Sequence, residues 1–249
     1  MNNNLIYIVV GAPRSGTSAL SLVLQEQGIG MFMSSDAPDQ DSPSGNQEDN
    51  IVRLINNRLM GRNDNGDIRD WDNPIYVGGA SVKAIRLIQA YIQLRRNHAS
   101  GTWGVKDPRT CFLIEAWNLA TNNLSVQWIH IYREDRDAIL RSLIKMLPPK
   151  IRNCNDPKTL YRLVSNWHET YRVAIELGFT RTGIEPITLS YEELLTTEGQ
   201  ARIAQVLNFT LPFRCINPSL NRQGSPLKME KPATSMVELV RHSNNAFTN

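Results

Sequence analysis

Cysteine is scarce in this chain and cannot supply its framework. Three cysteines, Cys111, Cys154 and Cys215, are widely spaced among the 249 residues, with no C-x-x-C pair and no histidine at ligand spacing. This arrangement argues against both a disulfide scaffold and a zinc site. It favours a reducing compartment.

Long apolar runs are also missing. The N-terminal segment MNNNLIYIVVGAP has no basic region, and its apolar stretch at 5–10 spans only six residues before Gly11. A signal peptide or a membrane anchor needs a longer apolar segment. We therefore expect no transmembrane segment and a cytoplasmic location.

Charge of either sign is not in excess. A formal net charge of +3 is too small to indicate a nucleic-acid partner, although a local basic site for an anionic cofactor would account for it. With 41% hydrophobic and 20% charged residues, the composition is that of a globular protein. We expect one domain over 1–224, followed by a polar tail at 225–249 that is partly disordered.

Strand-like and helix-like patterns alternate along the chain. The strand patterns cover 5–10, 103–106, 125–132 and 186–189. The helical patterns cover 17–28, 47–61, 80–98, 110–120, 135–146, 157–178, 190–195 and 201–207. This alternation predicts an α/β fold with a central, mostly parallel sheet and helices on both faces.

A glycine-containing loop joins the first strand to the first helix. The segment GAPRSGTS, residues 11–18, has the G-x-x-x-x-G spacing of a nucleotide P-loop, but Thr17 stands where the Walker lysine is expected. Backbone N–H groups and a helix N-terminus converge here, which suits a phosphate. The loop's cation is Arg14. The simpler alternative is a turn that only connects strand to helix.

The form P-[KR]-S-G-T-[ST] after a strand resembles the 5'-phosphosulfate loop of the sulfotransferases that use 3'-phosphoadenosine 5'-phosphosulfate, here with arginine. The resemblance implies a P-loop-like architecture and a sulfuryl donor. It also implies that the donor's phosphosulfate group is held by Arg14, Ser15, Gly16, Thr17 and Ser18.

A second strand-to-helix crossing places Arg133 at a strand end and Ser142 on the next helix. Carboxyl ends of parallel strands share one edge, so Arg133 and the first loop should share a crevice. A guanidinium and a hydroxyl suit a terminal phosphate. The pair resembles the 3'-phosphate motif of sulfotransferases, with the wider spacing of the bacterial trehalose sulfotransferase branch. The alternative is a solvated helix start.

The segment WGVKDPR at 103–109 resembles the K-D-P-[RF] segment of tyrosylprotein and bacterial sulfotransferases. There the lysine lies near the transferring group, which implies that Lys106 stabilises charge on the leaving phosphate oxygen. A surface lysine before a turn is the alternative reading.

Two later segments extend the resemblance. Residues 189–195, LSYEELL, resemble the Y-E-[DE]-L-L that follows a late strand in this superfamily, which implies that Tyr191 lies near the adenosine. A buried core tyrosine is the alternative. Arg222, within R-Q-G, is a weak match to the basic loop that covers the cofactor in cytosolic members.

Sulfuryl transfer also needs a base, and the segment SGNQE at 44–48 resembles the G-x-x-E at the start of the second helix in bacterial members. Glu48 is therefore the candidate base, with Asp36 and Asp39 in reserve. The alternative for Glu48 is an acidic residue that complements a helix N-terminus. The four histidines are too scattered to compete, and His130 and His168 are expected to be structural.

Together these motifs predict a metal-independent sulfotransferase that moves a sulfuryl group to the hydroxyl of a small-molecule, lipid or glycan acceptor. Two rival hypotheses stay open. One is a P-loop nucleotide or small-molecule kinase, which the missing Walker lysine disfavours. The other is a catalytically silent nucleotide-binding module, which would lack a working base at Glu48.

Overall fold

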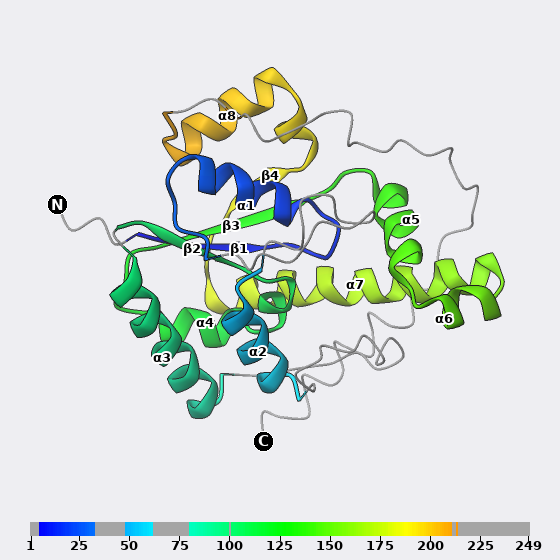
Figure 1. Ribbon diagram of the computed structural model, residues 1–249, viewed down its shortest axis with the longest axis horizontal. Coiled ribbons are helices and arrows are strands. Elements are labelled where there is room, and N and C mark those ends of the chain that lie inside the picture. Colours follow the sequence, from blue (N-terminus) through cyan, green and yellow to red (C-terminus); the bar gives the residue numbers. More distant parts are fainter. Residues whose placement is uncertain (1–4, 33–47, 62–79, 100, 211–212, 214–249) are drawn as a thin grey trace.

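The chain folds around a four-stranded parallel sheet in a computed structural model, which describes residues 5–32, 48–61, 80–99, 101–210 and 213 (Figure 1). The strands are β1 (Ile6–Val10), β2 (Trp103–Lys106), β3 (Val126–Tyr132) and β4 (Ile187–Ser190). Their order in the sheet is β2-β1-β3-β4, and every neighbouring pair is parallel. The predicted α/β class is confirmed.

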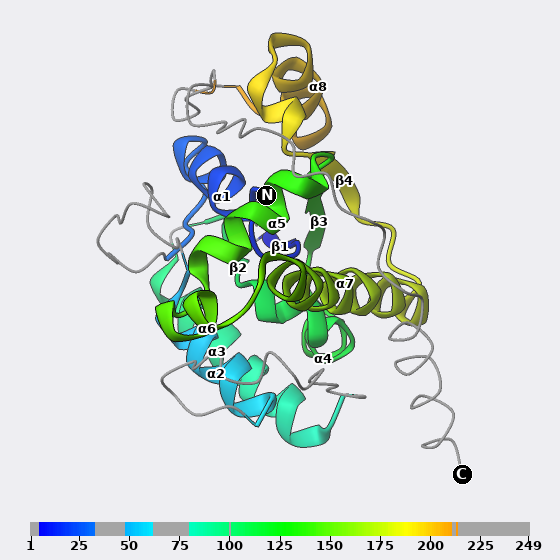
Figure 2. The same cartoon turned by 90° about the vertical axis from the view of Figure 1, so that its right-hand side faces the viewer.

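Helices cover both faces of the sheet (Figures 1 and 2). One layer contains α1 (Thr17–Glu26) and α8 (Thr197–Leu207). The opposite layer contains α2 (Asn50–Leu59), α3 (Val82–His98), α4 (Ile114–Ala120) and the long α7 (Pro157–Thr182). Beyond the carboxyl ends of the strands lie α5 (Arg136–Met146) and α6 (Pro149–Cys154). Two 3-10 turns, η2 (Pro108–Phe112) and η3 (Glu192–Leu195), follow β2 and β4.

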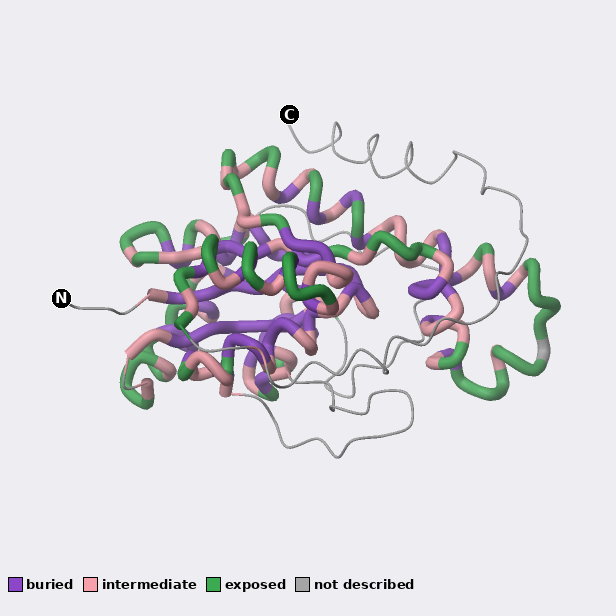
Figure 3. The backbone as a smooth tube through the Cα atoms, turned by 90° about the horizontal axis from the view of Figure 1, so that it is seen from above, coloured by how far each residue is buried: buried purple, intermediate pink, exposed green. Residues whose placement is uncertain are grey.

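All five residues of β1 are buried because the strand lies between two hydrophobic layers. Ile6, Ile8 and Val10 pack into the core that α2, α3, α4 and α7 complete, whereas Tyr7 and Val9 face the core of α1 and α8. Successive side chains of a strand point to opposite faces, so a strand covered on both sides is apolar throughout. The purple interior in Figure 3 follows this arrangement.

The long helix α7 differs from the sequence prediction, which ended it at Gly178. It continues to Thr182, and Gly183 terminates it in the left-handed conformation. Gly178 is instead a packing position, since a Cβ there would lie 2.8 Å from the Cβ of Ile114 on α4. The missing side chain lets α7 approach α4, so this glycine serves close approach and not helix termination.

Other boundaries differ in smaller ways. The helix predicted over 110–120 is divided into η2 and α4, and the one predicted over 190–195 is the 3-10 turn η3. Pro148-Pro149 ends α5 as expected, but Pro149 also begins α6, because proline is tolerated in the first turn of a helix. The predicted tail at 225–249 lies outside the described residues.

Candidate functional site

Candidate residues from all four strands meet at the carboxyl edge of the sheet. Arg14 follows β1, Lys106 ends β2, Arg133 follows β3 and Tyr191 follows β4. In open parallel sheets this is the edge where ligands bind. The topology therefore gathers segments that lie far apart in the sequence.

The loop after β1 turns sharply to place the N-terminus of α1 at this edge. Arg14 and Gly16 both adopt left-handed backbone conformations, with φ of 70° and 97°. Gly16 is the residue that precedes α1, so it contributes no capping side chain, and the first turn of the helix contains no acidic residue. The positive end of α1 is thus not neutralised by its own first turn, and an anion is favoured there.

Arg14 connects the two strand-to-helix crossings. Its Nε donates a 2.6 Å hydrogen bond to Oγ of Ser142, which lies on α5, 128 residues further along the chain. Ser142 therefore lies beside the loop, although its separation from Arg133 in the sequence is the wider one noted above. One guanidinium and one hydroxyl from separate crossings are already side by side.

Tyr191 packs directly on the glycine of the loop. A Cβ on Gly16 would lie 2.5 Å from Cδ2 of Tyr191, so this close approach requires glycine. The Arg133 guanidinium carbon lies 4.9 Å from the centre of the Tyr191 ring, and Arg133 Nε is 3.8 Å from a carboxylate oxygen of Glu192. Burial raises the pKa of Tyr191, so its hydroxyl stays neutral.

Lys106 is buried, with 3% of its surface exposed, and its ammonium group reaches the same loop. Its Nζ donates to Oγ of Ser18 at 3.2 Å and lies 3.4 Å from Oε1 of Glu48. Burial lowers the pKa of Lys106, against the opposing effect of Glu48 and Asp107. The lysine is therefore a cation that releases its proton more readily than an exposed lysine does.

Glu48 is held by two cations. Besides Lys106, Nη2 of Arg109 donates to Oε2 of Glu48 at 2.7 Å. Arg109 is itself fixed by Asp107, which accepts bonds of 2.8 and 2.9 Å from its guanidinium. No role was predicted for Arg109 from the sequence. Its position in the K-D-P-[RF] segment is the signal that could have indicated one.

The helix start next to Glu48 is fixed by Asp49. The sequence prediction put Glu48 in the first turn of a helix from Gln47, but α2 begins at Asn50 and Asp49 is its N-cap, accepting from the Ile51 amide at 2.8 Å. Asp49 is buried and also accepts from the hydroxyl of Tyr91 at 2.9 Å and from Arg95 on α3. The acidic residue that complements this helix N-terminus is therefore Asp49, and Glu48 is directed to Lys106 and Arg109.

Three predicted site residues are not placed. Asp36, Asp39 and Arg222 lie outside the described residues. Arg14, Ser15, Gly16, Thr17 and Ser18 lie together in the loop and the start of α1, and the remaining candidates surround them. Within the part of the chain that is described, no helix has both the length and the apolar character needed to cross a membrane.

Comparison with known proteins gives the fold. No protein-family model matches the chain, and a search of curated proteins finds no significant match. Among solved structures, the chain resembles the sulfotransferase domain of the Synechococcus PCC 7002 olefin synthase, with 12% identity, 98% of this chain and 95% of that one covered, and a TM-score of 0.52.

Two further structures agree. The sulfotransferase domain from the curacin biosynthetic pathway has 12% identity, coverage of 96% of this chain and 97% of that one, and a TM-score of 0.54. Sulfotransferase STF9 from Mycobacterium avium has 16% identity, coverage of 100% and 69%, and a TM-score of 0.54. The chain therefore has the fold of sulfotransferase domains, as its motifs predict.

Proposed function

We propose that this protein is a sulfotransferase that uses 3'-phosphoadenosine 5'-phosphosulfate and transfers its sulfuryl group to the hydroxyl of a small-molecule, lipid or glycan acceptor. The observation that carries the proposal is the hydrogen bond between Arg14 and Ser142. It joins the loop that would hold a phosphosulfate to the helix that would hold a terminal phosphate, within a fold that sulfotransferase domains share.

The residues present suit this donor. The start of α1, which has neither a capping side chain nor an acidic first turn, offers N–H groups to the phosphosulfate, and Arg14 adds a cation from the loop. Arg133 and Ser142 offer donors to the 3'-phosphate. The Tyr191 ring, which lies against Gly16 and beneath Arg133, forms an aromatic wall that would lie near the adenosine.

Glu48 would act on the acceptor hydroxyl and Lys106 on the leaving phosphate of the donor. When bound, the donor supplies a sulfuryl group that the acceptor oxygen takes up as the bond to the phosphate oxygen breaks. The Glu48 carboxylate takes the proton of the acceptor hydroxyl, and Lys106 stabilises the negative charge that the leaving phosphate oxygen acquires. Arg109 keeps Glu48 in place through its 2.7 Å contact.

The donor specificity can be tested by thermal unfolding. A ligand that binds only the native state raises the melting temperature, so 3',5'-adenosine bisphosphate should stabilise the protein more than ATP with magnesium does. Ser142→Ala should reduce that stabilisation, whereas Ser125→Ala, before the amino end of β3, should not. A larger effect of ATP with magnesium would support a kinase instead.

Glu48→Gln tests the base. The amide keeps the size of the side chain but cannot accept a proton, so turnover should fall by a factor of about 10² to 10⁴. Binding of adenosine bisphosphate should stay unchanged, as should both properties in Glu198→Gln, a control on the exposed start of α8. Unchanged turnover in Glu48→Gln would assign the base to another residue. Binding without turnover in the unmodified protein would favour the silent nucleotide-binding module.

A further inference from the structure

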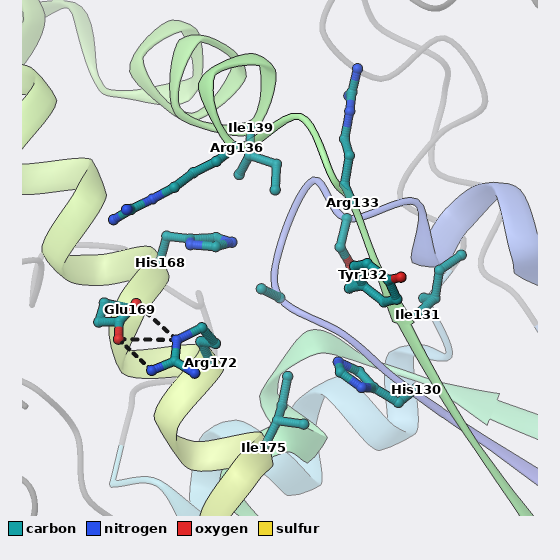
Figure 4. Close-up of a pocket in the computed structure, with 12 residues that line it drawn as sticks. His130, Ile131, Tyr132, Arg133, Arg136, Ile139, His168, Glu169, Arg172 and Ile175 are labelled. Carbon is teal, nitrogen blue, oxygen red and sulfur yellow. Dashed lines mark hydrogen bonds and ion pairs between the residues drawn. The ribbon is translucent and has the colours of Figure 1, made fainter. Parts of the chain in front are cut away.

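A cavity of about 390 Å³ lies beneath the phosphate loop at 11–18, and its lining includes neither Glu48 nor Lys106. It is enclosed by the loop, the carboxyl end of β3, the first turn of α5 and the middle of α7 (Figure 4). Ser15 and Arg133, which we expect to contact the donor, also line it, but Ser142 and Tyr191 do not. Its volume is within the range of small-molecule sites in proteins.

The inner wall of the cavity is largely apolar. Ala12 contributes from the loop, Ile139 from α5 and Ile175 from α7, whereas the side chain of Ile131 on β3 packs in the core of α1 and α8 on the other face of the sheet. All four residues are buried. A wall of this kind favours the apolar body of a ligand, because its burial removes hydrocarbon surface from water.

Two buried polar atoms of the lining lack partners among the described residues. They are Oγ of Ser15, whose residue is 1% exposed, and Nδ1 of His168. A buried polar group without a hydrogen bond costs about 1–3 kcal/mol. A ligand that satisfies both atoms would recover that cost, and a hydroxyl is suited to it because it can both donate and accept.

Charged side chains that line the cavity already have partners elsewhere in the protein. Arg136 donates to Oγ of Ser165 at 2.8 Å, and Arg172 forms ion pairs with Glu169 and Glu176. Figure 4 shows Arg133 directed away from the side chains of α7. His130 and His168, which line the cavity, are neutral at pH 7, because burial lowers the pKa of each to about 4. The interior therefore offers uncharged hydrogen-bonding groups.

We propose that this cavity is a binding site for a compact, uncharged ring compound that carries a hydroxyl group. The ring occupies the space between Ile139 and Ile175, and the hydroxyl lies between Ser15 and His168. This inference does not depend on sulfuryl transfer, since it rests on the cavity alone. Because Ser15 and Ala12 also belong to the phosphate loop, a ligand here and an anion in the loop should change each other's affinity by the same factor.

Isothermal titration of the full chain with 4-methylphenol and 4-methylbenzoate tests the proposal. The two probes share a ring, but at pH 7 the phenol is neutral and the benzoate is an anion. We expect 4-methylphenol to bind the unmodified protein more tightly than 4-methylbenzoate. Equal or tighter binding of the benzoate, or no binding of either probe, would overturn the proposal.

His168→Ala should weaken 4-methylphenol binding by about tenfold, the loss of one buried hydrogen bond. The matched control is His98→Ala, at the exposed end of α3, which should bind as the unmodified protein does. Ile175→Phe, which fills the cavity, should abolish binding while the variant keeps the far-ultraviolet circular dichroism spectrum and the cooperative thermal unfolding of the unmodified protein, so a folding defect would be recognised. Unchanged affinity in His168→Ala and Ile175→Phe would refute the site.

If His168→Ala does not fold, the imidazole signals of the unmodified protein give the same information. The chain has only four histidines, so their ring C–H resonances can be resolved. On titration with 4-methylphenol, the signals of His130 and His168 should shift and that of His98, at the exposed end of α3, should not. A shift confined to His98 would place the ligand elsewhere.

Discussion

Gly16→Ala should destabilise the fold through two separable costs. Gly16 has φ of +97°, and an L-residue in this region of the backbone costs about 1–2 kcal/mol. The new Cβ would also lie 2.5 Å from Cδ2 and 3.1 Å from Cβ of Tyr191. Neither atom can move away unless the whole Tyr191 side chain shifts. Overpacking of this kind adds about 1–3 kcal/mol.

Gly61→Ala is the matched control. Gly61 also has a positive φ, of 68°, but no heavy atom lies within 4 Å of its Cβ position. It therefore incurs the backbone cost alone. The difference between the two variants isolates the contact with Tyr191, at about 1–3 kcal/mol, which for a chain of this size is about 2–12 °C in melting temperature.

The assay is chemical unfolding followed by circular dichroism, with adenosine bisphosphate titrated into each variant. Gly16→Ala should lose nucleotide affinity as well as stability, because the displaced Tyr191 ring would form one wall of the proposed nucleotide site. The double variant Gly16→Ala with Tyr191→Ala should be less destabilised than the sum of the two single changes. Equal losses in Gly16→Ala and Gly61→Ala would refute the reasoning.

Two further predictions concern the two sides of α7. His130 and His168 have folded-state pKa values of about 4, below the usual 6.5, so the unfolded chain binds more protons and stability should fall as the pH is lowered from about 6.5 towards 4. Urea unfolding at pH 7 and pH 5 should show a smaller drop in the free energy of unfolding for the His130→Gln, His168→Gln double variant than for the unmodified protein. An equal drop would exclude these imidazoles as the cause. Gly178→Ala should destabilise by about 1–3 kcal/mol although alanine is the better helix former, because its Cβ meets Ile114; thermal unfolding checks the sign, and a gain in stability would show that α4 yields.

The spacing of apolar residues was sufficient to predict the fold class and most of the helices and strands, because the faces that each element buries determine that spacing. The apolar run of β1 reflects a strand covered on both faces, and the helical stripes reflect one covered face each. Gly178 misled the prediction because a glycine needed for close packing and a glycine that ends a helix look the same in a sequence. Only the position of α4 distinguishes them.

The candidate site was predictable where residues follow strand ends. Lys106 ends β2, Tyr191 directly follows β4 and Arg14 lies in the loop after β1, so parallel topology alone brings them to one edge. The partners of Glu48 were less accessible. The contact between Arg109 and Glu48 and the capping of α2 by Asp49 depend on the directions of these side chains. The sequence pattern around them did not lead to either prediction.

The order of the strands also constrains how the chain can assemble. β1 leaves the ribosome before β2 and β3, yet Ile6 pairs with Trp103 on one side and with Val126 on the other. The two hydrogen-bonding edges of β1 cannot both be satisfied until both of those later strands have been synthesised. An apolar strand with two open edges is a template for wrong pairing. During synthesis, the strand that leads into the loop at 11–18 therefore stays open to wrong pairing until those strands have been made.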